Sequence, residues 1–138
     1  MARFNTEGLD DLINEMERLG QNTGPVAEEM VNAAVDVIRE EWRKSAEKHG
    51  HRDTGAMIKS IGIGPGPVKA GGLLYRDVYP QGKDSKGVRN AEKAFILHYG
   101  TARIPASYWV DDADDASGEP VQTVCQEIWD RFLASGGQ

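Results

Sequence analysis

The residues of this chain best suited to chemistry lie in the segment His49-Gly50-His51-Arg52-Asp53. Two imidazoles and a carboxylate are donor types that bind zinc and other transition metals. The chain supplies no further ligand at a defined spacing, and short His-x-His segments often arise by chance. We therefore interpret the segment as a solvated loop after the end of a helix. A small metal-dependent hydrolase that uses His49, His51 and Asp53 is kept as an alternative function.

Two other patterns could bind a charged ligand. Glycine is frequent between residues 62 and 72, but neither a G-x-G-x-x-G segment opening a helix nor a G-x-x-x-x-G-K-[ST] pattern is present, so nucleotide binding is set aside. A run of aspartates could attract a divalent cation, yet it lacks the glycine and the terminal glutamate of an EF-hand loop. We interpret this run as an acidic surface; its members are Asp111, Asp112, Asp114 and Asp115. We expect no cofactor, no metal and no catalytic residue.

Hydrophobic spacing predicts the helices that position these residues in the N-terminal third. A short helix is expected over residues 6–20, ending at Gly20, because apolar residues recur there at three-four spacing. They are Leu9, Leu12, Ile13, Met16 and Leu19. Pro25 then suits the first turn of a long amphipathic helix over residues 25–48. Its apolar stripe comprises Val26, Met30, Val31, Ala34, Val35, Ile38 and Trp42.

The middle of the chain changes to the two-residue period of strands. Asp53 or Thr54 is expected to cap a short helical turn, which directs three apolar side chains to the core: Met57, Ile58 and Ile61. Strands are predicted at residues 61–64, 73–78 and 94–99, within a sheet region that covers residues 54–104. His98 is then a hydrogen-bonded residue of the third strand. The polar segment 81–90 is predicted to be a long hairpin loop.

The last predicted element is a helix over residues 118–134, with Pro120 in its first turn. The single cysteine, Cys125, lies within its apolar pattern and is interpreted as a buried, inert thiol, because a lone cysteine forms no disulfide framework. The chain is expected to be one α+β domain over residues 1–138. A long amphipathic N-terminal helix and a C-terminal helix would pack on a small antiparallel sheet with a long protruding hairpin loop.

Charge is distributed along the chain in three blocks. The net charge of -6 comprises -4 over residues 1–68 (8 basic, 12 acidic), +4 over residues 69–103 (7 basic, 3 acidic) and -6 over residues 104–138 (1 basic, 7 acidic). The acidic C-terminal third argues against duplex DNA as an attractive ligand. No apolar run approaches the length of a membrane span, and the polar N-terminus does not resemble a signal peptide. We therefore expect a cytoplasmic protein with no membrane partner.

Three motifs follow one another at a defined spacing. They are Thr54-Gly55-x-Met57-x-x-Ser60-Ile61, the run from Ala94 to Tyr99-Gly100-Thr101, and Pro105-Ala106-x-x-Trp109-Val110-x-x-Ala113. In this order, within residues 26–132, they resemble the tail-component family of long-tailed (lambdoid, HK-type) phages. Met57 replaces the usual leucine, which conserves volume. His98 stands where the family usually carries glutamate, so a role that the family's glutamate plays is not expected of this position.

The resemblance implies a non-enzymatic structural protein of the virion, made in the cytoplasm of the bacterial host. Its role would be head-to-tail joining or tail completion. It would form a homo-oligomeric ring, hexameric like a tail tube, between a head-closure or connector protein and the tail tube or tail terminator protein. DNA would pass through the channel without specific binding. A cellular α+β adaptor is the second alternative.

A closed ring needs two different, complementary patches on each subunit. We expect the first patch to be the basic loop that carries Lys83, Lys86, Arg89 and Lys93. Its acidic counterpart is expected at Asp111, Asp112, Asp114 and Asp115, or on the outer face of the long helix. Ile104 and Tyr108 are predicted interface residues because they lie in a loop, whereas Trp109 is predicted to be buried.

Overall fold

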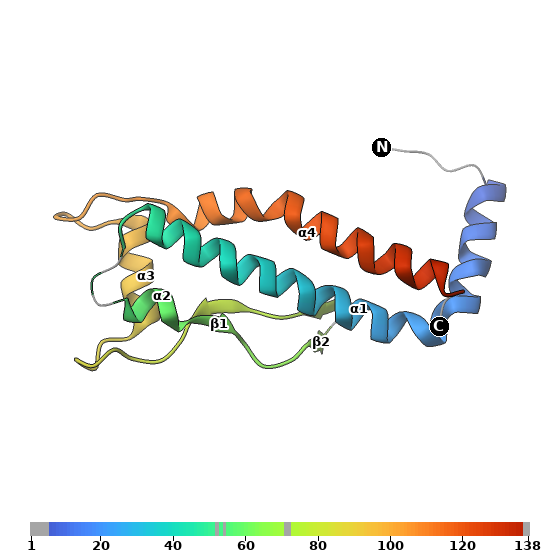
Figure 1. Cartoon of the computed structure of the whole chain (residues 1–138), viewed down its shortest axis with the longest axis horizontal. Helices are drawn as coiled ribbons and strands as arrows, with labels where there is room; N and C mark the ends of the chain where they lie inside the picture. The colour runs from blue at the N-terminus through green and yellow to red at the C-terminus, as the bar shows by residue number, and fades with distance from the viewer. Residues whose placement is uncertain (1–5, 52, 54, 71–72, 137–138) are drawn as a thin grey trace.

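A computed structural model describes the backbone of residues 6–51, 53, 55–70 and 73–136. Its helices are α1 (Thr6–Lys48), α2 (Ala56–Ser60), α3 (Asn90–Tyr99) and α4 (Trp109–Ala134). Its strands are β1 (Ile61–Ile63), β2 (Val68–Ala70), β3 (Leu73–Tyr75) and β4 (Val78–Pro80). Figure 1 shows α1 and α4 as a long antiparallel pair, with the strands on the other side of α1 and with α2 and α3 at one end. The predicted α+β class is confirmed.

α1 is a single helix of 43 residues, so the prediction of two helices separated by a break after Gly20 was wrong. Pro25 lies inside this helix and has no N–H to donate to the carbonyl of residue 21. Figure 1 shows the consequence, because the first turns of α1 stand at a steep angle to the remainder. The glycine and proline residues of this stretch therefore bend the helix instead of ending it. We call residues 6–20 the N-terminal arm.

α4 packs along α1 and not on the strands, as Figure 1 shows. Small residues on its inner side, Ala113 and Ser117, are buried and let the two helices approach closely. Farther along, Ile128 and Phe132 are buried as the helical spacing predicted. Cys125 is a free, half-buried thiol whose Sγ lies 3.8 Å from the carbonyl oxygen of Met30 on α1.

The predicted start of the C-terminal helix at residue 118 was wrong, because α4 already begins at Trp109. Asp111 and Asp112 occupy its first turn, where the helix dipole favours anions. Pro120 is accommodated inside the helix. Within the part of the chain described above, no helix has both the length and the apolar character needed to cross a membrane.

The strands form two separate antiparallel ribbons, β1 with β4 and β2 with β3. β1 ends before Pro65, as the proline-rich segment predicted, and pairs Ile61 with Pro80. The ribbons are fastened to α1 by arginine side chains. Arg76 donates to the Asn32 side chain at 2.8 Å and to the Gly64 carbonyl at 2.9 Å. The prediction of a single sheet within residues 54–104 was therefore wrong, because the strands form two short ribbons.

The strand predicted at residues 94–99 was wrong, because this segment belongs to α3. It begins with the helix formers Ala91, Glu92, Lys93 and Ala94, which favour a helix over the predicted strand. His98 consequently lies on a helix and not on a strand, and it is buried.

The core lies where α1, α2, α3 and the start of α4 meet. It contains Ala46, Met57, Ile58, Ile61, Ala94 and Trp109. Trp109 is fully buried, and its ring packs edge-on against Trp42 of α1 at 5.6 Å between centroids. The prediction that Trp109 is a core residue is confirmed, as is the burial of the three apolar residues of the first motif.

Candidate assembly interface

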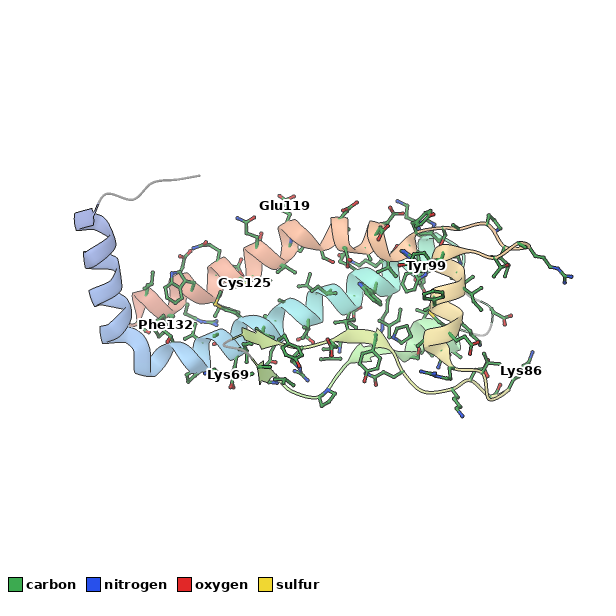
Figure 2. All side chains as sticks on the ribbon, turned by 180° about the vertical axis from the view of Figure 1, so that it is seen from behind. Lys69, Lys86, Tyr99, Glu119, Cys125 and Phe132 are labelled. Carbon is green, nitrogen blue, oxygen red and sulfur yellow. The ribbon has the colours of Figure 1, made fainter. Side chains whose placement is uncertain are left out.

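The end of the molecule that carries α3 also carries two projecting loops, 81–89 and 100–108. Figure 1 shows both loops extending beyond the helices at this end, on opposite sides. Figure 2 shows Tyr99 on α3 and Lys86 at the tip of the neighbouring loop. All ten residues that the sequence analysis assigned to an interface lie in these loops, in α3 or at the start of α4.

Loop 81–89 connects β4 to α3, so it is not the strand-to-strand hairpin that was predicted. Asp84 organises it from within, since its carboxylate accepts the backbone N–H groups of Lys86 and Val88, each at 2.9 Å. The same carboxylate pairs with Lys93 of α3 and is only 7% exposed. The Lys93 hydrogen bond, followed by the Val88 N–H, lowers the pKa of Asp84 below its usual value.

The basic residues of this region therefore differ in whether they can contact a partner. Lys93 is engaged with Asp84 and holds the loop against α3. Lys83, Lys86 and Arg89 are exposed, and the backbones of Lys83 and Arg89 form a bridge across the base of the loop. An ordered basic loop is thus presented to solvent.

Loop 100–108 is compact because of two residues of the Gly-Thr motif. Gly100 has φ 79°, and a Cβ there would lie 2.6 Å from the Ala106 nitrogen and 2.7 Å from the Ile104 oxygen. Only glycine fits such a close approach. The Thr101 hydroxyl oxygen accepts the N–H groups of Arg103 at 3.2 Å and Ile104 at 3.1 Å. The motif therefore makes a tight turn.

The base of this loop is held by Ser107. Its hydroxyl donates to the Leu97 carbonyl at 2.7 Å and accepts a hydrogen bond from His51 Nε2 at 2.8 Å. Tyr108 then adopts a left-handed backbone conformation (φ 51°), which is unfavourable for a residue other than glycine, and its N–H donates to the His98 carbonyl at 3.0 Å.

The pKa of the His51 imidazole is lowered below its usual value, first by partial burial and next by the neighbouring His49.

The two histidines expected in a solvated loop are engaged in separate structural contacts. His49 donates from Nε2 to the Asp112 carboxylate at 2.7 Å, whereas His51 binds Ser107. Asp53 is exposed, and Thr54 and Arg52 lie outside the described residues. Among the residues with a described position, no group of three or more histidine, cysteine, aspartate or glutamate side chains could hold a metal ion.

His98 of α3 contacts the start of α4. The Val110 N–H donates to His98 Nδ1 at 3.3 Å, so the ring proton is on Nε2. That nitrogen faces the Asp111 carboxylate at 3.8 Å. The imidazole thus acts as a buried acceptor at a helix junction.

An exposed aromatic patch, which we define as Phe95, Tyr99 and Tyr108, was missed by the sequence analysis except for Tyr108. These side chains are 64%, 58% and 51% exposed, and the rings of Phe95 and Tyr99 lie 4.7 Å apart. Their four-residue spacing was the available signal, because it places both rings on one face of a helix. Ile104 is also exposed. Phe95 and Tyr99 line a hollow of about 290 Å³, which is otherwise formed mainly by Trp42, Pro80, Ala91, Ala94, His98 and Val110.

The acidic run occupies the first turns of α4. Asp111 and Asp112 are mostly exposed, with 67% and 61% of the side chain accessible. Asp114 accepts a hydrogen bond from Trp42 Nε1 at 3.3 Å, and Asp115 is exposed. The run therefore forms an acidic surface that is tied to Trp42 of α1 and, through Asp112, to His49 just after the end of α1.

Comparisons of this chain with protein-family models, with curated proteins and with solved structures returned no match.

Proposed function

We propose that this protein is a structural component of a tailed bacteriophage virion, which forms a ring at the joint between head and tail as a neck or tail-completion protein. One observation carries the proposal: the three motifs of the resemblance meet in one buried cluster, and the exposed surface next to it carries two oppositely charged patches and an aromatic one.

Residues of all three motifs stabilise the fold. Met57 and Ile61 of the first motif, Ala94 of the second and Trp109 of the third belong to the same core. The Gly-Thr pair shapes loop 100–108. If these segments build a common core, a structural protein would keep them in a fixed order. This role of the motifs requires no catalytic residue.

The charged patches suit a contact between neighbouring subunits. A ring closes through a heterologous interface, in which one patch of a subunit meets a different patch of the next. Loop 81–89 and the first turns of α4 project on different sides of the same end (Figure 1). The first exposes Lys83, Lys86 and Arg89, and the second exposes Asp111 and Asp115. Opposite charges on opposite sides favour such a pairing.

The proposal includes the neighbours of the ring and its cargo. A head-closure or connector protein would lie on one side and the tail tube or tail terminator protein on the other. DNA would pass through the channel without specific binding, because acidic side chains repel phosphate and the chain carries a net charge of -6.

Light scattering and electron microscopy of the purified protein test this proposal. We expect closed rings whose mass is a whole multiple of the 15.1 kDa chain, and which dissociate as salt is raised. Lys86→Glu should weaken assembly, because it reverses a charge of the basic loop. Lys69→Glu makes the same change in charge on β2, away from that loop (Figure 2), and should have no effect.

Two results would contradict the proposal. Discrete dimers or open filaments in place of rings would exclude a joint that encloses DNA. Equal effects of Lys86→Glu and Lys69→Glu would show that net charge, and not the basic loop, governs assembly.

A further inference from the structure

We propose that the hollow beside α3 binds a cationic side chain, and that its occupant is Lys86 of a second copy, presented on that copy's loop 81–89. This inference rests on the proposed function and deepens it, since it names the surface that receives the basic loop in the neighbouring subunit. The contact combines a carboxylate with aromatic rings, whose faces attract a cation.

The hollow is lined by aromatic rings and by one carboxylate. Trp42 of α1 and Phe95, His98 and Tyr99 of α3 contribute the rings, and Asp111 of α4 contributes the carboxylate. Phe95 and Tyr99 are more than half exposed, so their rings are accessible to a ligand. Among the lining residues of the described chain, Asp111 alone bears a formal charge while His98 is neutral. Such a surface favours a cation over an anion.

The charge around the hollow is also negative. Residues 109–115, which start α4, contain four acidic residues and no basic residue, a net charge of -4. Asp114 accepts a hydrogen bond from the Trp42 indole at 3.3 Å, so a second carboxylate lies beside the lining. The side chain of Asp111 is 67% exposed and is therefore accessible to an incoming cation.

Loop 81–89 presents a cation on an ordered turn. The N–H of Gly87 donates to the Asp84 carbonyl at 3.1 Å, which closes a β-turn with Asp84 first, Lys86 third and Gly87 fourth. The Asp84 side chain also accepts the N–H groups of Lys86 and Val88. A loop fixed in this way loses little conformational entropy on binding. Lys86 is exposed at its tip, as Figure 2 shows.

Charge favours this loop as the occupant of the hollow. Residues 81–89 contain three basic residues and one acidic residue, a net charge of +2. The acidic residue is Asp84, whose carboxylate is engaged within the loop. By contrast, the only basic residue of the C-terminal block 104–138 is Arg131, which pairs with Glu29. Attraction between the loop and the acidic start of α4 brings these two surfaces together.

The loop and the hollow of one copy lie on different sides of α3. Lys93, which pairs with the loop, and Phe95, which lines the hollow, are two residues apart and thus about 200° apart around the helix. Lys93 instead lines a cavity beside α2. Figure 2 shows Lys86 and Tyr99 on different sides of this end of the molecule. The contact therefore joins two copies, and it is heterologous because the two surfaces differ.

A double-mutant cycle in the full-length protein tests the contact. Lys86→Gln removes the cation, and Tyr99→Leu replaces an exposed ring with an apolar side chain that has no aromatic face. Each should lower the association constant of the contact by roughly tenfold, measured by light scattering over a concentration series. The double variant should be within about twofold of the weaker single variant, because both residues act in one contact.

Matched controls separate the contact from general effects of charge and surface area. Lys69→Gln and Tyr75→Leu make the same changes at exposed positions of β2 and β3, and should leave self-association unchanged. Tyr99→Phe keeps an aromatic ring and should assemble as the wild type does. Circular dichroism should show the wild-type helix content for every variant, because all the substituted residues are exposed.

The outcomes distinguish this inference from the proposed function. If the effects of Lys86→Gln and Tyr99→Leu multiply in the double variant, or if Tyr99→Leu assembles like the wild type, Lys86 does not occupy the hollow, and the inference is wrong. Closed rings in that case would leave the proposed function standing. Coupled effects in a protein that forms open chains would support the contact and overturn the ring. A wild-type protein that is monomeric at every concentration would overturn the contact between copies.

Discussion

The indole of Trp109 donates a hydrogen bond to the carbonyl of Ala94 at 3.2 Å and so joins α4 to α3 inside the core. The carbonyl of the same tryptophan accepts a hydrogen bond from the Ser45 hydroxyl of α1 at 2.5 Å. One residue therefore connects three helices. The loops of the candidate interface depend on this junction, because α3 and the start of α4 carry them.

We predict that replacing Trp109 destabilises the protein strongly. Trp109→Ala removes a fully buried ring and should lower the free energy of unfolding by about 3–5 kcal/mol. Trp109→Phe keeps much of the volume and should have a smaller effect. Urea denaturation followed by circular dichroism measures both. Trp129→Phe, at a half-buried position of α4, serves as the control, and an equal loss there would contradict the prediction.

We predict opposite effects of alanine at two glycines. Gly100→Ala should destabilise the protein by more than about 1 kcal/mol, because φ is 79° and backbone atoms lie within 2.7 Å of the new Cβ. Gly118→Ala, inside α4 with no atom within 4 Å, should stabilise it by up to about 1 kcal/mol. Thermal unfolding of the two variants, followed by circular dichroism, measures this difference. Similar melting temperatures would show that the turn is not constrained.

We predict that the Asp84 carboxylate stabilises the fold only while it is ionised. The pKa of Asp84 is lower in the folded protein than its usual 3.8, so the contribution is present above that pH and is lost as the pH falls through the folded value. Asp84→Asn should therefore lower the melting temperature at pH 7. The difference in melting temperature between Asp84→Asn and the wild type should become smaller as the pH falls below about 3.8. A gap that stays constant down to pH 2 would contradict this assignment.

We predict that His51 makes the free energy of unfolding depend on pH in a higher range than Asp84 does, with stability again lost as the pH falls. The pKa of His51 is lower in the folded protein than its usual 6.5, so the unfolded chain binds the proton more readily. The free energy of unfolding should fall as the pH drops below about 6.5 and should not change from this cause above it. His51→Gln keeps an N–H donor for Ser107 and should reduce the slope. Urea titrations between pH 5 and 8 measure it, and equal slopes would exclude His51 as the source.

Much of the core could be predicted from the sequence. The burial of Met57, Ile58, Ile61 and Trp109 follows from large apolar side chains that recur at helical spacing or follow a turn. The strand at residue 61 follows from its alternation and from the prolines that end it. These features depend on residues close in sequence, so local chemistry determines them.

Other elements could not be predicted, because local signals there conflict. The run at residues 94–99 is apolar enough for a strand, but contacts with α2 and α4 stabilise a helix and bury His98. Gly20, Gly24 and Pro25 normally end a helix, yet packing of the adjoining part of α1 against α4 keeps the chain helical through the bend.

The sequence by itself predicted the burial of Met57, Ile58, Ile61 and Trp109, the three charge blocks and the apolar spacing of residues 6–20, because each depends on residue type and spacing alone. Only the tertiary structure decided which polar residues are engaged within the fold and which face solvent. Lys93 pairs with Asp84, whereas Lys86 is exposed, although both belong to the same basic segment. Phe95 and Tyr99 became a surface patch because Ala94 and His98 of the same helix fill the interior. A helix can bury only one side against its neighbours, and long-range packing chooses that side.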